Sequence, residues 1–341
     1  MSGAVTVIGA GAWGTALAAR LAAEGRRTRL WARDARRAAE LAVTRENARL
    51  LPGVTLPAAL AVTSDAGAAL AGASAVLLAV PVQGLAEVAA AIAPHWPGEA
   101  PAVLCAKGID AATLRLPHET VRAILPGIAV AVLTGPNFAH EIAAGLPAAA
   151  VLAAPEEGVR AGLAALIGLS RFRLYPSADL TGAALGGAAK NVIAIAAGVV
   201  EGLGLGENAR AALITRGVAE LTRLVVAEGG RAETAAGLSG LGDLVLTATG
   251  GASRNHALGI ALGRGEALDA ALGARAGVTE GVATAPALVA RAARHGVELP
   301  IAAAVATLLA GRATAAALAE ALLARAPREE GWGHDGAAAR P

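Results

Sequence analysis

Residues 5–14 read Val5-Thr-Val-Ile-Gly9-Ala-Gly11-Ala-Trp13-Gly14, and this stretch decides the fold of the first half of the chain. An apolar run that predicts a strand leads directly into a Gly-x-Gly-x-x-Gly turn that opens a predicted helix. In such a turn Gly9 makes the tight bend, Gly11 lets a pyrophosphate approach the backbone, and Gly14 lets helix and strand pack closely. The pyrophosphate then sits on the helix N-terminus, where free N–H groups favour an anion. The stretch therefore predicts a dinucleotide-binding domain of the Rossmann type.

Strands and helices are predicted to alternate outward from this turn. The predicted strands cover residues 4–8, 28–31, 75–80, 102–105, 128–133 and 148–152, and the helices between them cover 13–24, 35–50, 84–92 and 116–124. This alternation predicts a parallel sheet with helices on both faces, an α/β fold. After about residue 178 only helices are predicted, over 180–201, 208–228, 241–248, 254–262, 279–294 and 302–309, and Asp179 is a plausible N-cap for the first of them.

The change from mixed to helical sequence sets the expected domain boundaries. We expect a Rossmann domain over residues 1–180 and an all-α domain over 181–326. The Gly- and Pro-rich stretch 327–341 has the composition of a disordered tail.

Two residues at the end of the second predicted strand bear on the choice of nucleotide. Asp34 lies 20 residues past Gly14, where an NAD-type motif holds the ribose hydroxyls, and Arg33 is of the type that holds the 2′-phosphate of NADP. Neighbouring side chains at a strand end point to opposite sides, so we expect one of the two to face the ribose. We favour Arg33 and NADP(H), with NAD(H) as the alternative. Both residues could also be solvated parts of a turn.

Lysine is rare in this chain and therefore informative. Arginine supplies 27 of the 29 basic residues, and only Lys107 and Lys190 are lysines. A guanidinium stays protonated, whereas a buried ammonium can lower its pKa and exchange a proton. Lys107 ends an apolar run, and Lys190 lies in an apolar helix that would bury it. These positions favour a functional site for both lysines over the simpler view that they survived a drift towards arginine.

A second group of polar residues follows in the helical half. Asp243 and Thr247 are spaced i, i+4 and share one helix face. Ser253, Arg254 and Asn255 resemble an N-cap and a first helical turn, which is a ready site for a phosphate. Taken singly, Asp243 could be an ordinary helix-start carboxylate and Arg254 a solvated charge. Together with the buried lysine they would supply a proton shuttle, an orienting carboxylate and an anion clamp.

Composition excludes several classes of partner. The net charge of +2 comes without a Lys/Arg block interleaved with aromatics, so we expect a small anionic substrate and no nucleic acid.

The single cysteine, Cys105, excludes an internal disulfide, fits a reducing cytoplasm and is expected to be a core residue. The histidines show no ligand spacing, so we predict no metal site. The uncharged stretches 1–19 and 66–86 are too interrupted by Gly, Pro and polar residues to span a membrane.

Several motifs, in order along residues 4 to 325, resemble those of the bacterial NAD(P)-dependent sn-glycerol-3-phosphate dehydrogenase family. They are Gly-Ala-Gly-Ala-Trp-Gly-Thr-Ala-Leu-Ala (9–18), Ala-Lys-Gly-Ile (106–109), Thr-Gly-Pro-Asn-Phe-Ala-His-Glu-Ile-Ala-Ala-Gly-Leu-Pro (134–147), Lys-Asn-Val-Ile-Ala-Ile-Ala-Ala-Gly (190–198), Asn-Ala-Arg-Ala-Ala-Leu-Ile-Thr-Arg-Gly (208–217), Ser-Gly-Leu-Gly-Asp-Leu-Val-Leu-Thr (239–247), Ser-Arg-Asn (253–255) and Val-Thr-Glu-Gly-Val (278–282). The Lys-Asn, Gly-Leu-Gly-Asp and Ser-Arg-Asn set is far more specific than the glycine turn.

The resemblance implies a Rossmann domain followed by an all-α domain, as in 6-phosphogluconate dehydrogenase, and a cytoplasmic homodimer. The implied reaction is reversible hydride transfer between NAD(P)H and dihydroxyacetone phosphate, giving sn-glycerol 3-phosphate for glycerophospholipid synthesis. Lys190 would be the proton donor and acceptor, with Asp243 and Thr247 positioning it or the substrate. The implied substrate contacts are Lys107, Gly135, Asn137, Lys190, Asn191, Asp243, Ser253, Arg254 and Asn255. The implied nucleotide contacts, besides the three glycines, are Trp13, Arg33, Lys107, Ala139, Arg254, Val278 and Glu280.

The sequence departs from the family pattern in ways that spare the proposed catalytic groups. Ala12 stands where relatives often have Ser, which removes a possible hydrogen bond to phosphate and bears on nucleotide affinity. His140, Ala248 and Gln83 replace a usual Lys, Cys and His. Rival interpretations are a ketopantoate reductase, a 6-phosphogluconate dehydrogenase, or a protein that binds NAD(P) without chemistry. The Ser-Arg-Asn helix start argues against the first two, and a buried lysine with an acidic partner argues against the third.

Overall fold

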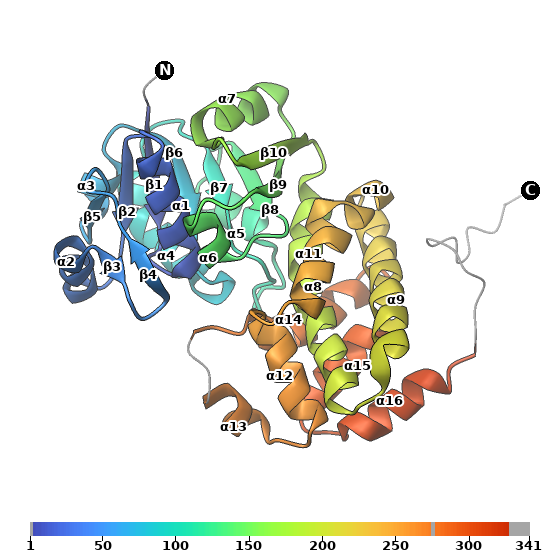
Figure 1. Cartoon of the computed structure of the whole chain (residues 1–341). Helices are drawn as coiled ribbons and strands as arrows, with labels where there is room; N and C mark the ends of the chain where they lie inside the picture. Colours follow the sequence, from blue (N-terminus) through green and yellow to red (C-terminus); the bar gives the residue numbers. More distant parts are fainter. Residues whose placement is uncertain (1–2, 274–276, 327–341) are drawn as a thin grey trace, which may run out of the picture.

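The computed structural model describes residues 3–273 and 277–326, so the expected tail over 327–341 lies outside the described residues. Figure 1 shows a sheet flanked by helices, joined to a bundle of helices in which α8 (Leu180–Gly202) is central. The last strand ends at Ser177, and every described element after it is helical.

An eight-stranded sheet forms the first half, as the alternating pattern predicts. Its order is β10-β9-β8-β7-β6-β1-β2-β5. The strands are β1 (Ala4–Ile8), β2 (Thr28–Trp31), β5 (Ala61–Thr63), β6 (Ala73–Leu78), β7 (Ala102–Leu104), β8 (Val130–Thr134), β9 (Ala148–Ala153) and β10 (Phe172–Ser177). The strands from β8 to β5 are parallel, with Val5 and Val7 of β1 facing one core and Ile8 the other.

The predicted parallel sheet is confirmed except at one edge. β9 pairs antiparallel with β8, and β10 then pairs parallel with β9. The connection between β8 and β9 contains only the short helix α6 (Ala139–Ala143) and stays at one end of the sheet, so the next strand must run back. The sequence analysis did not predict β10, whose Pro176 is tolerated because this strand lies at the sheet edge.

The predicted helix over 35–50 is also too long. Helix α2 (Ala35–Thr44) ends where Arg45 adopts a left-handed conformation with a φ of 54°. The chain then forms a small antiparallel hairpin from β3 (Glu46–Asn47) and β4 (Leu51–Thr55). A left-handed arginine carries no sequence signal comparable to a glycine, because non-glycine residues rarely adopt that conformation.

Helices cover both faces of the sheet. One face packs against α1 (Ala12–Ala23), α2, α6 and α7 (Glu157–Ile167). The other packs against α3 (Ala66–Leu70), α4 (Leu85–Ile92) and α5 (Pro117–Ile124), with short 3-10 turns at Val82–Gly84 and Ala93–His95. The core on this second face continues into the helical bundle, so the two halves share one apolar cluster. The predicted core position of Cys105 is confirmed, because it is buried.

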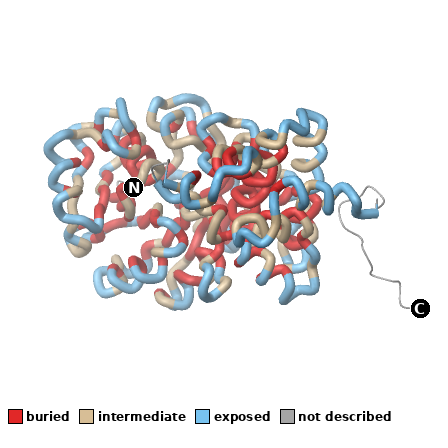
Figure 2. The backbone as a smooth tube through the Cα atoms, turned by 90° about the horizontal axis from the view of Figure 1, so that it is seen from below, coloured by how far each residue is buried: buried red, intermediate tan, exposed pale blue. Residues whose placement is uncertain are grey.

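The bundle is built around α8. The surrounding helices are α9 (Gly206–Ala227), α10 (Ala232–Ala236), α11 (Asp243–Thr249), α12 (Arg254–Gly263), α13 (Leu268–Gly273), α14 (Glu280–Ala293), α15 (Pro300–Leu309) and α16 (Ala315–Leu323). Asp179 caps α8 as predicted, since its Oδ1 accepts a hydrogen bond from Gly182 N at 2.8 Å. Figure 2 shows the buried segments concentrated inside the molecule. Among the described residues α8 alone is long and apolar enough to cross a membrane, and its apolar stretch is entirely buried within the protein.

Glycines let α12 approach α8 to backbone contact. Gly198 and Gly202 on α8 face Gly259 and Gly263 on α12. A Cβ at Gly198 would overlap the carbonyl oxygen of His256 and lie 2.9 Å from Gly259 Cα. Small residues at this spacing allow two helices to pack at their closest separation. The N-terminus of α12 is therefore held in a fixed position against α8, which carries Lys190.

Candidate active site

The two lysines of the chain meet at one buried carboxylate. Lys190 Nζ donates to Asp243 Oδ1 at 2.7 Å, and Lys107 Nζ donates to Asp243 Oδ2 at 2.6 Å. The Asp243 side chain is 1% exposed, while those of Lys190 and Lys107 are 11% and 17% exposed. Burial of Lys190 was predicted and is confirmed. Two ammonium groups on one carboxylate leave the cluster with one net positive charge, which suits an anionic substrate.

Further hydrogen bonds hold both lysines of this cluster in place. Lys190 Nζ donates to Thr247 Oγ1 at 2.9 Å, and Thr247 Oγ1 donates to the Asp243 carbonyl at 2.6 Å, as the i, i+4 spacing predicts. Lys107 Nζ donates to the Gly135 carbonyl at 2.8 Å. An ammonium has three N–H donors. Each lysine has two partners within the described residues, so each keeps one donor for a substrate oxygen.

The environment of Lys190 lowers its pKa to about 8. Burial is the largest cause, since desolvation disfavours the charged form. Asp243 opposes this effect by attraction, and the nearby Lys107 adds to it by repulsion. The proton of Lys190 is thus held loosely enough to be given up and regained near neutral pH.

Four chain segments bring these residues together. Lys107 follows β7, Gly135 follows β8, Lys190 lies in the middle of α8, and Asp243 opens α11. A π-helical turn at Leu238–Gly242 precedes α11 and packs on α8 so closely that a Cβ at Gly186 would lie 2.5 Å from the Ser239 carbonyl oxygen. Such turns occur frequently at functional sites. The site therefore lies where the carboxyl ends of parallel strands meet the bundle, the usual ligand site of an open α/β sheet.

An amide relay links the lysine cluster to the start of α12. Asn191 Nδ2 donates to the Lys107 carbonyl at 3.3 Å, and Asn255 Nδ2 donates to Asn191 Oδ1 at 3.0 Å. Gly281 N in turn donates to Asn255 Oδ1 at 3.0 Å. The predicted substrate residues Asn191 and Asn255 are thus in direct contact and connected to both lysine-bearing segments.

The N-terminus of α12 has the predicted capped form. Ser253 Oγ accepts a hydrogen bond from His256 N at 3.2 Å. Arg254 is exposed, and its guanidinium lies directly against Gly277. Glu280 opens α14 nearby, and burial raises its pKa to about 7 although Arg254 lowers it by attraction. Val278 is 48% exposed between them. These residues form one surface beside the amide relay.

The glycine turn provides the features that a dinucleotide requires. Gly9 has a φ of +110°, and a Cβ at Gly14 would overlap the Gly9 carbonyl oxygen, so both positions require glycine. A Cβ at Gly11 would meet nothing within 4 Å. Helix α1 begins without a side-chain cap, which leaves its first N–H groups available to a phosphate.

Two partly buried side chains near this turn carry buried polar atoms that have no hydrogen-bond partner among the described residues. They are the indole Nε1 of Trp13 and both amide atoms of Asn137. Buried polar atoms are normally paired, so such orphans mark places where a bound molecule can supply the partner. Ala139, another predicted contact, begins the adjacent helix α6. These observations together fit a nicotinamide dinucleotide along the glycine turn.

The two residues expected to determine nucleotide specificity, Arg33 and Asp34, have different contacts. Arg33 is exposed, and its Nη1 lies 3.2 Å from Glu87 Oε1. Asp34 Oδ1 accepts a hydrogen bond from Arg37 N at 2.9 Å and caps α2. The sequence analysis missed Arg37, whose Nη2 donates to Asn47 Oδ1 at 2.8 Å and to the Ala10 carbonyl at 3.3 Å, beside the glycine turn. One side chain in an arginine-rich helix start carries no signal that could have identified it.

Comparisons with known proteins show the family to which the chain belongs. A family model described as the NAD-dependent glycerol-3-phosphate dehydrogenase N-terminus matches residues 4–159, and one for the C-terminus matches residues 179–320. A glycerol-3-phosphate dehydrogenase [NAD(P)+] from Acidiphilium cryptum is 57% identical over 324 residues, covering 95% of this chain and 97% of the relative. The enzyme of that name from Rhodospirillum rubrum is 51% identical, covering 96% and 94%.

A solved structure of this family matches the chain more closely than a ketopantoate reductase does. The crystal structure of glycerol-3-phosphate dehydrogenase from Coxiella burnetii matches with a TM-score of 0.91 and 38% identity, covering 95% of this chain and 99% of that one. A ketopantoate reductase from Ralstonia eutropha matches with a TM-score of 0.59 and 19% identity, covering 93% and 99%, a likeness of fold alone. The chain belongs to the NAD-dependent glycerol-3-phosphate dehydrogenase family.

Proposed function

We propose that the protein catalyses reversible hydride transfer between NAD(P)H and dihydroxyacetone phosphate, giving sn-glycerol 3-phosphate. The observation that carries this proposal is the buried Lys190–Asp243–Lys107 cluster beside the N-terminus of α12. This arrangement combines a titratable proton donor, Lys190, with a helix start suited to a phosphate. Lys190 and Asp243 are 53 residues apart in the sequence but form a hydrogen bond in the structure. A ketone that carries a phosphate group needs both.

Lys190 acts as the acid and the base in this proposal. The bound nicotinamide supplies or accepts the hydride at C2 of the substrate. During reduction, negative charge develops on the C2 oxygen, and the Lys190 ammonium stabilises it and then gives it a proton. In the oxidation direction the neutral amine takes the proton from the hydroxyl. A pKa of about 8 leaves both forms populated near neutral pH.

The neighbours of Lys190 orient it and hold the substrate. Asp243 and Thr247 hold the Nζ atom of Lys190, and we assign Lys107 and Asn191 to the hydroxyl oxygens of the substrate. We assign the phosphate to the start of α12, where Ser253, Arg254 and Asn255 combine a capped helix N-terminus with a guanidinium. We also assign Gly135, whose carbonyl accepts a hydrogen bond from Lys107, and Asn137 to the substrate site, as the family resemblance implies.

The nucleotide would lie along the glycine turn and reach Lys107. Its contacts, carried over from the family resemblance, are Gly9, Gly11, Trp13, Gly14, Arg33, Lys107, Ala139, Arg254, Val278 and Glu280. We favour NADP(H) over NAD(H), because the Asp34 carboxylate is engaged as the cap of α2 and Arg33 is solvent-exposed. We further propose a cytoplasmic homodimer that serves glycerophospholipid synthesis, with the two domains divided near residue 180.

The test measures the rates at which NADPH and NADH are oxidised with dihydroxyacetone phosphate as substrate. The readout is the absorbance of the reduced nicotinamide. We expect turnover with both nucleotides and a preference for NADPH. Dihydroxyacetone without the phosphate should be a far poorer substrate, and ketopantoate should not react. Equal activity with and without the phosphate group would contradict the role assigned to α12, and activity with ketopantoate alone would contradict the proposed reaction.

A further inference from the structure

A large cavity lies in the bundle, between α9, α15 and α16. Its volume is about 610 Å³, and it is partly open to solvent. Helix α8 forms its floor through Val199 and Val200, a few residues beyond the catalytic segment of that helix. Protein interiors rarely leave voids much larger than a water molecule. A cavity of this size is within the range of sites that bind small molecules.

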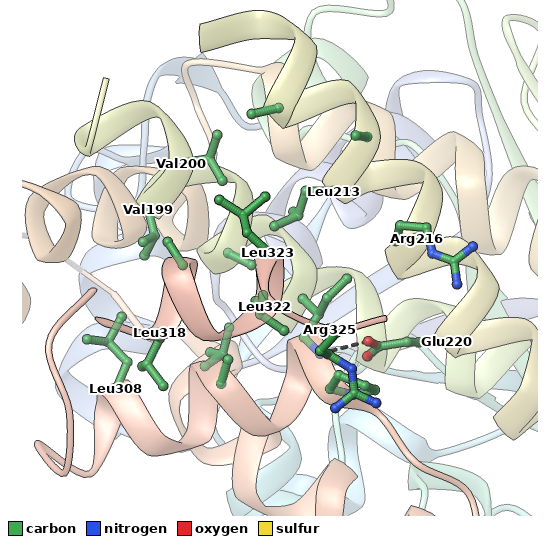
Figure 3. A pocket seen from close by; sticks show the side chains of 18 of the residues that line it. Val199, Val200, Leu213, Arg216, Glu220, Leu308, Leu318, Leu322, Leu323 and Arg325 are labelled. Atoms are coloured by element: carbon green, nitrogen blue, oxygen red, sulfur yellow. Dashed lines mark hydrogen bonds between the residues drawn. The ribbon is translucent and has the colours of Figure 1, made fainter. Parts of the chain in front are cut away.

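Most of the cavity wall is hydrocarbon. Figure 3 shows Val199, Leu308 and Leu318 at one end and Leu213, Leu322 and Leu323 towards the middle. Helix α16 lies over the cavity, and its Leu323 is 79% exposed. An apolar surface of this extent is costly to leave in water. The wall therefore favours an occupant with a hydrocarbon portion.

The opposite end of the cavity is charged, and cations outnumber anions there. Figure 3 shows Arg216, Glu220 and Arg325 together at this end, away from Leu308 and Leu318. Arg325 Nη2 lies 3.4 Å from Glu298 Oε2, and Arg223 Nη2 donates to the Glu298 carbonyl at 3.3 Å. Arg216 is exposed and has no ion-pair partner within the described residues.

Glu220 does not cancel this positive charge fully. It is buried, and its carboxylate accepts hydrogen bonds from Ile301 N at 2.7 Å and Ala302 N at 3.3 Å. Burial raises its pKa to about 7 in spite of these bonds, so it is partly protonated at neutral pH. Arg216 belongs to the family motif at 208–217, and the mechanism proposed above uses none of that motif.

We propose that this cavity binds a single-chain amphiphile, with its hydrocarbon chain along Val199, Leu308 and Leu318 and its anionic head group against Arg216. The head group is a carboxylate or a phosphate, either of which a guanidinium recognises. The concave shape, the apolar end and the cationic end together match such a molecule better than a flat protein surface. This inference does not depend on the proposed function.

The first experiment measures binding by calorimetry to the full-length protein, with each probe below its micellar concentration. The probes are laurate and dodecyl phosphate, with dodecyltrimethylammonium and hexanoate as controls for charge and chain length. We expect saturable binding of one or both anionic probes, and the control probes to bind at least about tenfold more weakly. Tridecanoate replaces laurate in a second titration so that the carboxylate and the phosphate probe carry the same dodecyl chain, and the tighter of the two identifies the head group. Absence of binding by both would overturn the proposal.

Two matched pairs of variants locate the bound probe. Ala319→Phe fills the cavity from α16, whereas Ala316→Phe places the same ring on an exposed position of that helix. We expect the first to weaken binding by about tenfold or more and the second to leave it within about twofold. Arg216→Ala should weaken the anionic probes, and Arg312→Ala, an exposed arginine outside the cavity, should not. Equal behaviour within either pair would place the probe elsewhere.

The other possible occupants give different results. If the cavity is covered by a second copy of the chain, Ala319→Phe will dissociate a dimer in analytical ultracentrifugation, and the anionic probes will not bind the dimer. If residues 327–341 fill it, the full chain will bind neither probe while a chain ending at Ala326 binds both. Each of these results would overturn the amphiphile proposal.

Discussion

The two halves of the candidate active site are prepared for their ligands in opposite ways. At the catalytic end, Lys190 and Asp243 of the bundle are buried and already paired, and Lys107, which follows β7, pairs with the same carboxylate. On the sheet side, the nucleotide end consists of bare backbone, unpaired buried atoms of Trp13 and Asn137, and exposed charges such as Arg33. The side chains of the lysine cluster are thus fixed by one another without a ligand, whereas we expect the bound nucleotide to supply partners for the unpaired atoms of Trp13 and Asn137.

From this difference we expect catalysis to depend on the lysine cluster and nucleotide recognition to depend on the residues around the glycine turn. Changes at Lys190 or Asp243 should alter the rate or its pH dependence and leave nucleotide affinity intact, whereas Lys107 is assigned to both ligands. Changes at the nucleotide end should do the reverse.

Replacing Lys190 with Arg keeps the positive charge but removes a group that can exchange its proton. We expect kcat to fall by about 10²–10⁴-fold, the usual share of general acid–base catalysis. Calorimetry should show unchanged NADPH affinity, and circular dichroism should show an unaltered fold. Near-normal turnover in both directions would mean that Lys190 acts only as an electrostatic clamp.

Replacing Arg33 with Ala tests the nucleotide end. If the guanidinium holds the 2′-phosphate, NADPH binding should weaken by about 1.5–3 kcal/mol, the value of a charge-assisted hydrogen bond. NADH binding and kcat should change little. Glu87→Ala is the matched control, because it frees Arg33 from its ion pair and should not weaken NADPH. Equal losses for both nucleotides would remove Arg33 from the specificity site.

Replacing Gly198 with Ala tests the contact that positions α12. The added methyl group overlaps the His256 carbonyl and forces the two helices apart, at a cost of about 1–3 kcal/mol in stability. The melting temperature should fall and KM for dihydroxyacetone phosphate should rise, because the start of α12 moves. Gly162→Ala, on the exposed side of α7 with open space around it, should instead be neutral or slightly stabilising. A Gly198→Ala protein with unchanged stability and KM would show that the contact is not needed.

Replacing Asp243 with Asn should move the pH profile. The carboxylate raises the pKa of Lys190 above what burial and Lys107 would leave, so its loss should lower that pKa from about 8. Oxidation of glycerol 3-phosphate needs neutral Lys190, and its rate rises with pH through this pKa. The rise should therefore shift to lower pH by about one unit or more. Thr247→Val keeps the carboxylate and should shift the profile less; an unmoved profile in Asp243→Asn would contradict the proposed coupling.

Much of the fold could be predicted because its signals are local. The strand at 4–8 and the glycine turn lie within ten residues, and the caps at Asp179 and Ser253 depend on residues three positions away. The reversed strand β9 and the left-handed Arg45 could not be predicted. Strand direction depends on the path of a connection, and an arginine at positive φ is permitted only by its surroundings.

The site was predictable residue by residue but not as a set of contacts. Asp243 was expected beside Lys190, yet its equally short bond to Lys107 joins residues 136 positions apart and has no periodic pattern. The family motifs named the members of the amide relay, and only the fold shows that Asn255 donates to Asn191. Contacts of this kind arise from packing between elements, to which a single sequence gives little access.

The pairing of both lysines on one carboxylate has a practical consequence. Because Lys107 and Lys190 are the only lysines in the chain, isotope labelling restricted to lysine would give side-chain resonances from the active site and from nowhere else. The ionisation of Lys190 could then be followed directly while nucleotide and substrate are added in turn. Amine-selective chemical modification would be confined to the same two side chains and the terminal amine, so protection by a ligand would report occupancy of this site.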